Sequence, residues 1–368
     1  MFIPTIYDDL ATFPQQRYVH LFANTKPKSC FYSLAWFHNF TRHVLAPDEK
    51  LRVYGVEIDD SSRLPVAALL MRHKTSGGEV WQPRQLSSLS NYYSPLFGPI
   101  INTIYPDPSE ALHELVAIIC TDSLRWEMID LQPLDADSQV FRELIHFLRA
   151  AGLVVQTYFC FGNWYLPIEG RSYEEYLQSL PSNVKNTLHR KSKKLAKTDQ
   201  AHFEMVTNSS NIDQAIKAYE QIYHASWKTP EPFPQFVPGL IRLCAEAGWL
   251  RMGLVYIGGE PAAAQIWIVA EGTASIYKLA YDERFTAFSP GTLLTSRLME
   301  YVINVDKVLE VDYLTGDDPY KRDWMSHRRE RWGIRAFNPR TLRGALAAVR
   351  HVGGRMLKTM LHKHPNGQ

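Results

Sequence analysis

The residues best suited to chemistry lie in the last quarter of the sequence. Asp312 ends a short apolar strand, where a carboxylate beside a cleft can accept a proton from an amine. Tyr320 and Lys321 follow the turn Gly316–Pro319, and they could protonate a leaving group and stabilise a developing negative charge. We therefore predict Asp312 as the general base, with Tyr320 and Lys321 as the other catalytic residues.

Both charged residues also have a plain structural interpretation. Asp312 could cap a turn by hydrogen bonding near Gly316. Lys321 could be a surface lysine paired with Asp317 or Asp318. The sequence leaves these alternatives open.

A helix start that could bind an anion precedes these residues. Ser289 suits an N-cap, Pro290 the first helical turn, and Gly291 the close approach of a ligand. The free amides and the dipole of a helix favour a phosphate at such a position. We predict that Ser289, Pro290, Gly291 and Thr292 bind a donor phosphate; the alternative is an ordinary capped helix.

The strand Ile276–Ala280 leads into this helix start. Alternation places Tyr277 and Leu279 on one face and Lys278 and Ala280 on the other. One of these faces should look into the cleft, so we predict that Tyr277 and Lys278 also contact the donor. The alternative is that Tyr277 packs within the sheet and Lys278 is an ordinary surface lysine.

Three further residues are predicted to contact substrate. Trp227 and Lys228 close an amphipathic helix ahead of a proline-rich stretch, where a rim or a substrate-covering loop would lie. Trp324 ends the charged run that begins at Tyr320. Packing of Trp227 against a sheet is the alternative.

Nothing in the sequence resembles a Ser-His-Asp triad. Ser289 has no GxSxG context, and His224 and His327 have no identifiable partner. Direct transfer within a ternary complex is therefore preferred over a covalent enzyme intermediate.

Length and composition predict a folded protein of two domains. The chain has 368 residues, whereas single hydrophobic cores stop growing at about 250 to 300 residues. Its four cysteines are far apart, with no CxxC and no histidine at metal-ligand spacing, which predicts reduced thiols and no metal site. No leader pattern and no long apolar run is visible, so the sequence predicts a cytoplasmic protein.

A weak internal repeat supports two domains. A strand, tight turn and strand at residues 51–71 return at residues 250–267, about 199 residues later. Helical patterns precede each hairpin, at residues 33–44 before the first and at 212–227 and 236–246 before the second. A further strand and helix follow each hairpin, so both halves read as α+β units on a mostly antiparallel sheet. Chance similarity of two short hairpins is the alternative.

Positive charge is concentrated although the net charge is only +2. Residues 185–197 hold six Lys and Arg without an acid, in a helix for which Ser182 is the expected N-cap. The tail 340–364 is also acid-free, and its apolar residues, which include Met356 and Met360, are spaced as one face of an amphipathic helix. Such blocks can contact a polyanion or anionic lipid, and the alternatives are solvated helix faces or, for the tail, docking onto the protein's own core. We predict an N-terminal domain at 1–170, a donor-binding domain at 171–338 and a basic, helical tail at 339–368.

A family resemblance follows from several segments in their order and spacing. They are Phe31–Trp36, Tyr93–Leu96, residues 173–197, Gly259–Ala263, Ser289–Gly291 and Asp312–Lys321. Through about Trp332 the chain resembles the tandem GNAT-type acyltransferases. Specifically, it resembles the CelD-like, cellulose biosynthesis-associated branch, which is related to the Fem-type aminoacyl transferases of cell-wall synthesis.

The resemblance implies an α+β fold of two tandem GNAT-like domains, with mixed, mainly antiparallel sheets flanked by helices. It also implies a donor, typically an acyl-CoA such as acetyl-CoA, whose pantetheine follows a splayed strand and whose pyrophosphate meets the next helix N-terminus. The Q/RxxGxG/A loop of single-domain GNAT enzymes is absent, and Ser289-Pro290-Gly291 stands in its place. The identity of the donor therefore stays open.

Three functions remain at this point. The first is transfer of an acyl group, foremost acetyl, from acyl-CoA to an amine or hydroxyl of an envelope or polysaccharide-related acceptor. The second is a Fem-like transferase that uses aminoacyl-tRNA, with an acyl carrier as a further candidate partner. The third is a non-catalytic GNAT-fold protein that binds a ligand, a partner or, through its tail, the inner face of an anionic membrane.

Overall fold

The computed structural model describes residues 2–25, 29–75, 81–198 and 201–351. It divides into two compact units, residues 1–161 with 330–368 (unit 1) and residues 162–329 (unit 2). The limits of these units differ from those of the predicted domains 1–170 and 171–338, because two strands pass from one unit to the other. These are β7 (Val154–Pro167), which ends in unit 2, and β13 (His327–Phe337), which ends in unit 1.

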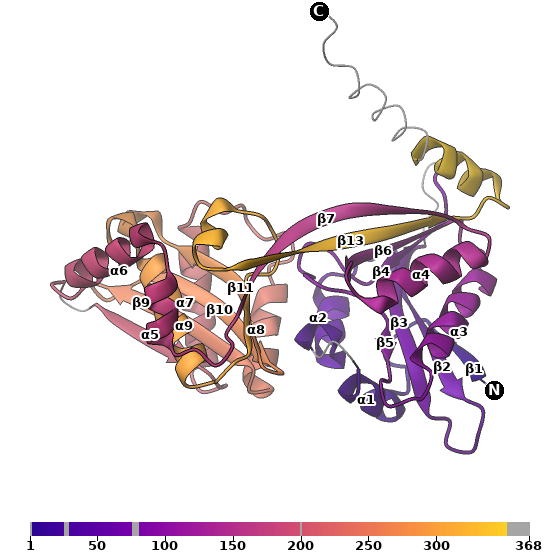
Figure 1. Ribbon diagram of the computed structural model, residues 1–368, viewed down its shortest axis with the longest axis horizontal. Coiled ribbons are helices and arrows are strands. Elements are labelled where there is room, and N and C mark those ends of the chain that lie inside the picture. Colours follow the sequence, from indigo (N-terminus) through magenta and orange to yellow (C-terminus); the bar gives the residue numbers. More distant parts are fainter. Residues whose placement is uncertain (1, 26–28, 76–80, 199–200, 352–368) are drawn as a thin grey trace, which may run out of the picture. The chain divides into compact units, whose positions relative to one another are not determined.

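Unit 1 is a mixed sheet with helices packed on it (Figure 1). Its elements are β1 (Phe2–Tyr7), α1 (Gln15–Ala23), η1 (Cys30–Tyr32), α2 (Leu34–His43), β2 (Glu49–Ile58), β3 (Pro65–Lys74), β4 (Gln85–Ser88), β5 (Ile100–Ile101), α3 (Pro108–Thr121), β6 (Met128–Asp135) and α4 (Gln139–Ala150). The strand order is β1-β2-β3-β4-β6-β13, and only the β4–β6 pair among these is parallel. Helix α3 packs against β2, β3 and α4.

Unit 2 follows the same plan. Its elements are α5 (Tyr173–Ser179), α6 (Ser182–Leu195), β8 (His202–Val206), α7 (Ile212–His224), α8 (Phe236–Glu246), β9 (Leu250–Ile257), β10 (Glu260–Ala270), β11 (Thr273–Tyr281), η2 (Glu283–Phe288), α9 (Pro290–Asn304), β12 (Glu310–Asp312) and η3 (Pro319–Asp323). The strand order is β7-β12-β11-β10-β9-β8, and only β11–β12 is parallel.

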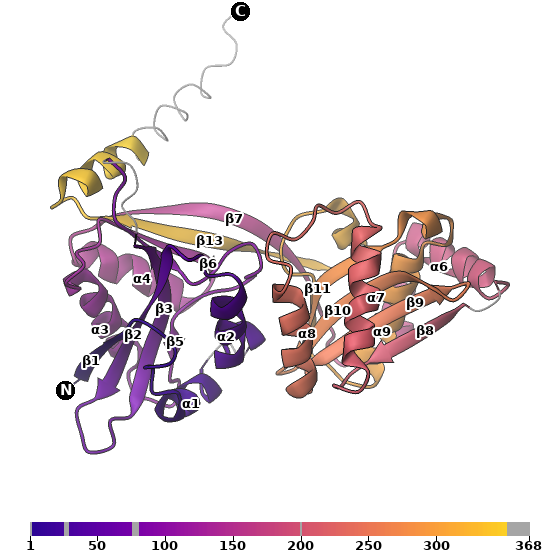
Figure 2. The same cartoon turned by 180° about the vertical axis from the view of Figure 1, so that it is seen from behind.

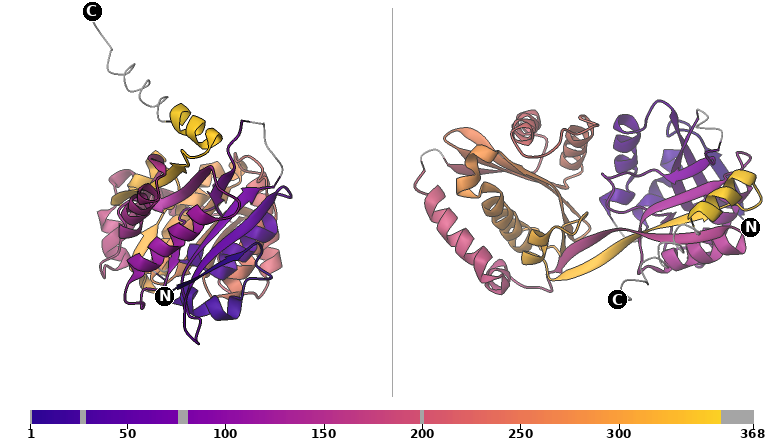
Figure 3. Two further views of the ribbon diagram at one scale, coloured as in Figure 1. Left: turned by 90° about the vertical axis from the view of Figure 1, so that its right-hand side faces the viewer. Right: turned by 90° about the horizontal axis from the view of Figure 1, so that it is seen from above.

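Two helical layers sandwich the sheet of unit 2. Helices α7 and α8 pack together on one face (Figure 2), and α5, α6 and α9 lie on the other, as the edge-on view shows (Figure 3). Apolar side chains of α9, α6 and β10 share one buried core, which includes Leu188, Trp267 and Leu298. This core fixes α6 against α9.

The predicted α+β fold of two related halves is confirmed. In both units a strand, two helices and three or four antiparallel strands are followed by a long helix and a strand parallel to its neighbour. The predicted hairpins are β2–β3 and β9–β10, and the predicted helix at 236–246 is α8. The internal repeat seen in the sequence is therefore a repeat of structure.

One local prediction near the basic helix is wrong. Ser182, expected as the N-cap of α6, is its first helical residue, and the cap is Pro181, which offers no side-chain hydrogen bond. The preceding helix α5 is the one with a side-chain cap, because Ser172 and Glu175 form a reciprocal capping box.

The C-terminal tail is described only as far as residue 351. Residues 342–351 are helical, with Ala348 packed on Met128 and Phe337 of unit 1, while Leu342 and Val349 are exposed. The predicted apolar positions Met356 and Met360 lie outside the described residues. In the described part of the chain, no helix has both the length and the hydropathy needed to cross a membrane.

Candidate functional site

Strands β11 and β12 diverge after a short parallel stretch. They pair only from Thr273 with Glu310 to Ser275 with Asp312, where β12 ends. Strand β11 continues to Tyr281 while it stays paired with β10 on its other edge. Among the described strands, none therefore flanks residues 276–281 on the β12 side, and a ligand with amide groups could pair there.

A cavity of about 380 Å³ lies among the residues beyond this divergence. Its walls come from the end of β11, the start of α9, the segment after β12 and the first turns of α6. The lining residues are Asn183, Val184, Thr187, Trp227, Gln265, Leu279, Tyr281, Gly291, Thr292, Thr295, Tyr313, Tyr320, Asp323 and Trp324. Such a volume is within the range of small-molecule sites, about 300 to 1,000 Å³.

The start of α9 opens onto the cavity. Gly291 and Thr292 line it, and the first turn of the helix holds no acid and receives no side-chain cap. Ser289 occupies the N-cap position with a left-handed backbone, φ +51°, and does not cap the helix as predicted. The first amides of α9 are thus left for another acceptor, and the positive end of the helix dipole lies at the same place.

Two lysines of α6 stand beside this helix start. Lys191 Nζ donates to the carbonyl oxygen of Ala287 at 2.6 Å, and Lys194 Nζ approaches the same oxygen at 3.4 Å. Lys194 also lies over the ring of Phe288, 4.6 Å from its centroid. Thr187, one helical turn before Lys191, lines the cavity, so one face of α6 runs from the cavity wall to these cations.

Gln265 of β10 holds the first turns of α9 in place. This fully buried side chain donates to the Gly291 carbonyl at 2.9 Å and to Thr295 Oγ1 at 2.7 Å. Its own oxygen accepts from Trp267 Nε1 at 2.8 Å. All its hydrogen-bonding groups but one lone pair are engaged, so the helix start has a defined position over the sheet.

Asp312 is held by three donors, and it does not line the cavity. Asn163 Nδ2 donates to Oδ1 at 2.5 Å, the Leu314 amide to the same oxygen at 2.6 Å, and Arg329 Nη2 to Oδ2 at 2.5 Å. The carboxylate is buried, and Arg329 also binds Glu310 at 2.7 Å. These contacts favour a role in positioning the end of β12 over the predicted role as a base.

Lys321 is buried and turned toward the backbone. Its Nζ donates to the carbonyls of Thr315 and Gly316, and it lies 3.3 Å from Asp318 Oδ2. Burial lowers the pKa of Lys321, and the nearby Asp318 opposes this effect. The pairing with Asp318 is the alternative that the sequence left open, whereas Asp317 pairs with Arg328 at 2.7 Å.

Tyr320 lines the cavity beside Tyr313. Burial, together with the negative charge of Asp318, raises the pKa of Tyr320 to about 12. The phenol is therefore protonated at neutral pH and can donate a proton.

Lys228 belongs to a group of three lysines and two carboxylates. Lys278 Nζ binds Glu231 at 2.6 Å and Lys321 is paired with Asp318, whereas no described residue accepts a hydrogen bond from Lys228 Nζ. Burial, together with the positive charge of Lys278, lowers the pKa of Lys228 to about 8. An appreciable fraction of Lys228 is therefore neutral near pH 8.

The structure brings together five of the predicted site residues at the cavity. They are Gly291, Thr292, Tyr320, Trp227 and Trp324. Seven others do not line it: Tyr277, Lys278, Ser289, Pro290, Asp312, Lys321 and Lys228. Tyr277 is the extra residue of a bulge, since Ile276 and Lys278 oppose consecutive residues of β10.

Sequence reasoning missed several lining residues. Asn183 and Thr187 lie in the basic segment, whose charge attracted attention but whose position over the cavity depends on tertiary packing. Gln265 is a single polar residue in an apolar strand, and this signal could have marked it, because a buried amide needs partners.

This region is similar to a known protein family. Residues 182–322, which contain nearly all of the cavity wall, match the family described as Acetyltransferase (GNAT) domain. Among curated proteins, none matches the chain significantly.

Solved structures extend the likeness to most of the chain. FemX shares 11% identity over 90% of this chain and 96% of its own, with a TM-score of 0.60. A conserved protein of unknown function from Bacteroides thetaiotaomicron shares 9% over 91% of this chain and 100% of its own, at 0.57. The C-terminal domain (DUF2156) of a putative lysylphosphatidylglycerol synthetase from Agrobacterium fabrum shares 12% over 93% and 95%, at 0.51.

At these identities the likeness is one of fold. Together with the family match, it supports a GNAT/Fem-like fold for this chain. The narrower CelD-like relationship stays a prediction.

Proposed function

We propose that the protein is an acyltransferase that moves an acyl group, foremost acetyl, from acyl-CoA to an amine or hydroxyl. The observation that carries the proposal is the cavity that begins where β11 extends past β12 and ends at the start of α9, which has no side-chain cap. An acceptor from the cell envelope or a polysaccharide is the choice favoured by the CelD-like resemblance.

The residues present fit the parts of an acyl-CoA. The edge of β11 beyond Ser275 offers backbone groups to the amides of pantetheine. The amides of Gly291 and Thr292 and the ammonium groups of Lys191 and Lys194 offer donors and positive charge to a diphosphate. Acyl-CoA supplies the thioester that is cleaved.

Lys228 is our proposed acceptor of the amine proton, in place of Asp312. Its Nζ lies 5.8 Å from the ring centroid of Trp227, which lines the cavity, and no described residue accepts a hydrogen bond from that Nζ. Burial and like charge keep part of Lys228 neutral. The Asp312 carboxylate, in contrast, is buried and held by three donors, Asn163, the Leu314 amide and Arg329, which fits a positioning role better.

Tyr320 is our proposed proton donor to sulfur. As the amine nitrogen bonds to the acyl carbon, the carbon–sulfur bond breaks and the sulfur keeps its electron pair. Tyr320 Oη gives its proton to that sulfur, and Lys228 Nζ takes the proton from the nitrogen. Solvent then returns a proton from Lys228 to Tyr320, so the protein is unchanged after one transfer.

Calorimetric titration with acetyl-CoA and with longer acyl-CoAs tests the donor site. We expect binding to the wild-type chain and a loss of at least about tenfold in Lys191→Ala/Lys194→Ala, because charge-assisted hydrogen bonds contribute about 1.5 to 3 kcal/mol each. Lys185→Ala/Lys193→Ala is the matched control, since it removes the same charge from the other face of α6. Absence of binding by every acyl-CoA would overturn the proposal.

The aminoacyl-tRNA alternative makes a different prediction. A tRNA would engage many cations of residues 185–197, so its affinity would fall steeply with salt and both double variants would weaken it. Binding of tRNA together with no binding of acyl-CoA would favour this alternative.

A further inference from the structure

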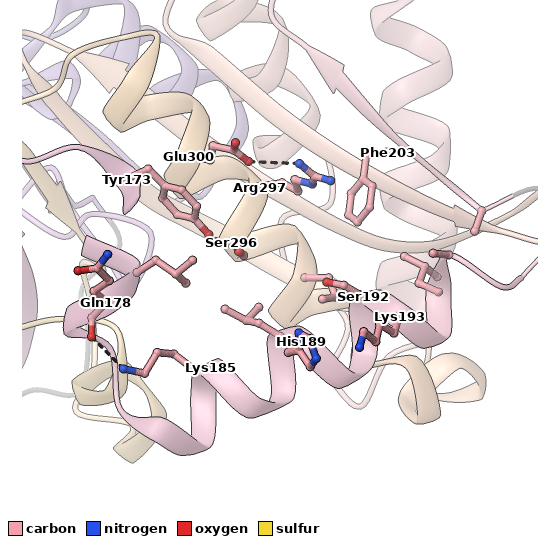
Figure 4. A pocket seen from close by; sticks show the side chains of 16 residues that line it. Tyr173, Gln178, Lys185, His189, Ser192, Lys193, Phe203, Ser296, Arg297 and Glu300 are labelled. Carbon is pink, nitrogen blue, oxygen red and sulfur yellow. Dashed lines mark hydrogen bonds and ion pairs between the residues drawn. The ribbon is translucent and has the colours of Figure 1, made fainter. Parts of the chain in front are cut away.

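A second and larger cavity lies on the other side of α6. It measures about 730 Å³ and is bordered by α5, the outer face of α6, β8 and the outer face of α9. Figure 4 shows Lys185, His189 and Lys193 of α6 facing Tyr173, Ser296 and Arg297 across the open space. None of its lining residues lines the cavity at the start of α9.

The inner surface of this groove is apolar. Leu177, Leu188, Leu195 and Leu293 line it, together with Phe203 of β8. Leu188, Leu195 and Leu293 belong to the core of unit 2, so the groove reaches down to that core. A purely polar ligand would leave this surface without favourable contacts.

The rim of the groove is positive. Lys185, Lys193 and Arg297 line it, and among the described lining residues Glu300 is the one acid. Glu300 lies 3.2 Å from Arg297, and Lys185 Nζ donates to the Gln178 carbonyl at 2.8 Å. Helix α6 itself carries five Lys and Arg and no acid, so the surplus charge at the rim is positive.

We propose that this groove binds a single-chain amphiphile with an anionic head group. The acyl chain lies on the leucine surface, and the head group lies between Lys185, Lys193 and Arg297. An acyl chain explains the apolar floor, and a negative head group explains the rim. An RNA strand would pair with the positive side chains of the rim but leave the leucine surface exposed to water, so the amphiphile is favoured.

The site is independent of the proposed acyl-CoA site. Because α6 separates the two cavities, Lys185 and Lys193 can be changed without touching Thr187, Lys191 or Lys194. Each pair of lysines therefore serves as the control for the other.

Isothermal titration calorimetry of the full chain with monomeric oleoyl lysophosphatidate tests the proposal. We expect one molecule bound per chain and at least tenfold weaker binding in Lys185→Ala/Lys193→Ala and in Leu177→Gln. Lys191→Ala/Lys194→Ala should bind the lysophosphatidate as the wild type does. Leu177 is only partly buried, so Leu177→Gln should keep the fold, which circular dichroism checks.

Two control ligands, a lysolipid with no net charge and an RNA, could overturn the proposal. Oleoyl lysophosphatidylcholine, which has the same chain and no net charge, should bind at least tenfold more weakly, and equal binding would overturn the anionic head-group site. A short single-stranded RNA should neither bind the groove nor displace the lysophosphatidate. Displacement that depends on Lys185 and Lys193 but not on Leu177 would identify a polyanion site instead.

Discussion

Lys228 differs from the neighbouring lysines because it has no anion bound to it. A lysine with its pKa near 8 is mostly protonated at pH 6.5 and mostly neutral at pH 9.5. If it accepts the amine proton, kcat/KM rises with pH through about 8 and then levels, since Tyr320, with a pKa near 12, stays protonated. This rise is our first prediction, measured as a pH–rate profile with acetyl-CoA and an amine acceptor.

Two variants separate chemistry from charge at this position. Lys228→Met and Lys228→Arg should each lower kcat by about 100-fold or more, because neither side chain can take a proton near neutral pH. Both should also lose the inflection near pH 8. An unchanged inflection in Lys228→Met would assign that titration to another group.

Stability provides a control for the same residue. The pKa of Lys228 is below that of an unfolded lysine, so the folded state gains stability as pH rises from about 8 to about 10.5. Below pH 8 the buried charge disfavours folding. Lys228→Met should therefore melt no lower than the wild type at pH 7, and a lower melting temperature would mean that packing explains its loss of activity.

Asp312 should act on stability more than on chemistry. Asp312→Ala removes one of the two carboxylates that pair with the Arg329 guanidinium, and it removes the hydrogen bond of 2.5 Å from Asn163 Nδ2. Removal of one partner from a buried pair costs about 3 to 5 kcal/mol. We predict a loss near the lower end of this range in urea unfolding.

The double variant Asp312→Ala/Arg329→Ala is the control. It removes both charges, so it should cost less than the sum of the two single changes. Full stability with complete loss of turnover in Asp312→Asn would instead restore Asp312 as the base predicted from the sequence.

At the scale of elements, the open edge of β11 is the feature that a donor would use. Residues 276–281 extend past the end of β12, so a donor bound along this edge would cover their backbone amides. We predict that acetyl-CoA slows hydrogen exchange in 276–281 and at the start of α9. Strands β2 and β3, which pair along their whole length, provide the unaffected reference.

The sequence revealed the elements better than their mutual positions. The helix at 236–246 and the β9–β10 hairpin follow from apolar periodicity and a Gly-Gly turn, which are local signals. The role of Gln265 depends on a carbonyl 26 residues away, and the side of α6 that faces α9 depends on the core. The bulge at Tyr277 also shifted the expected alternation, because one inserted residue reverses the faces that follow.

At the scale of the whole molecule, the two units have similar plans but different helix starts. Helix α3 of unit 1 corresponds to α9 of unit 2, since each precedes the strand with the parallel pairing. Asp107 caps α3, accepting from the Glu110 amide at 2.9 Å, and Glu110 adds a second acid to the first turn. Negative charge at this position opposes phosphate binding, whereas α9 has none in its first turn.

We therefore predict one acyl-CoA per chain. Native mass spectrometry at rising acetyl-CoA concentration should show a single bound equivalent that is weakened by Lys191→Ala/Lys194→Ala. A second equivalent that persists in that variant would indicate a donor site in unit 1.

The strands β7 and β13 have one more consequence. The end of β7, which closes the first repeat in sequence, pairs with β12 in unit 2, and β13, which closes the second, pairs with β6 in unit 1. Polypeptides ending or starting at residue 170 would each expose bare sheet edges, which invite aggregation. Each repeat therefore depends on the other for the strand that completes its sheet.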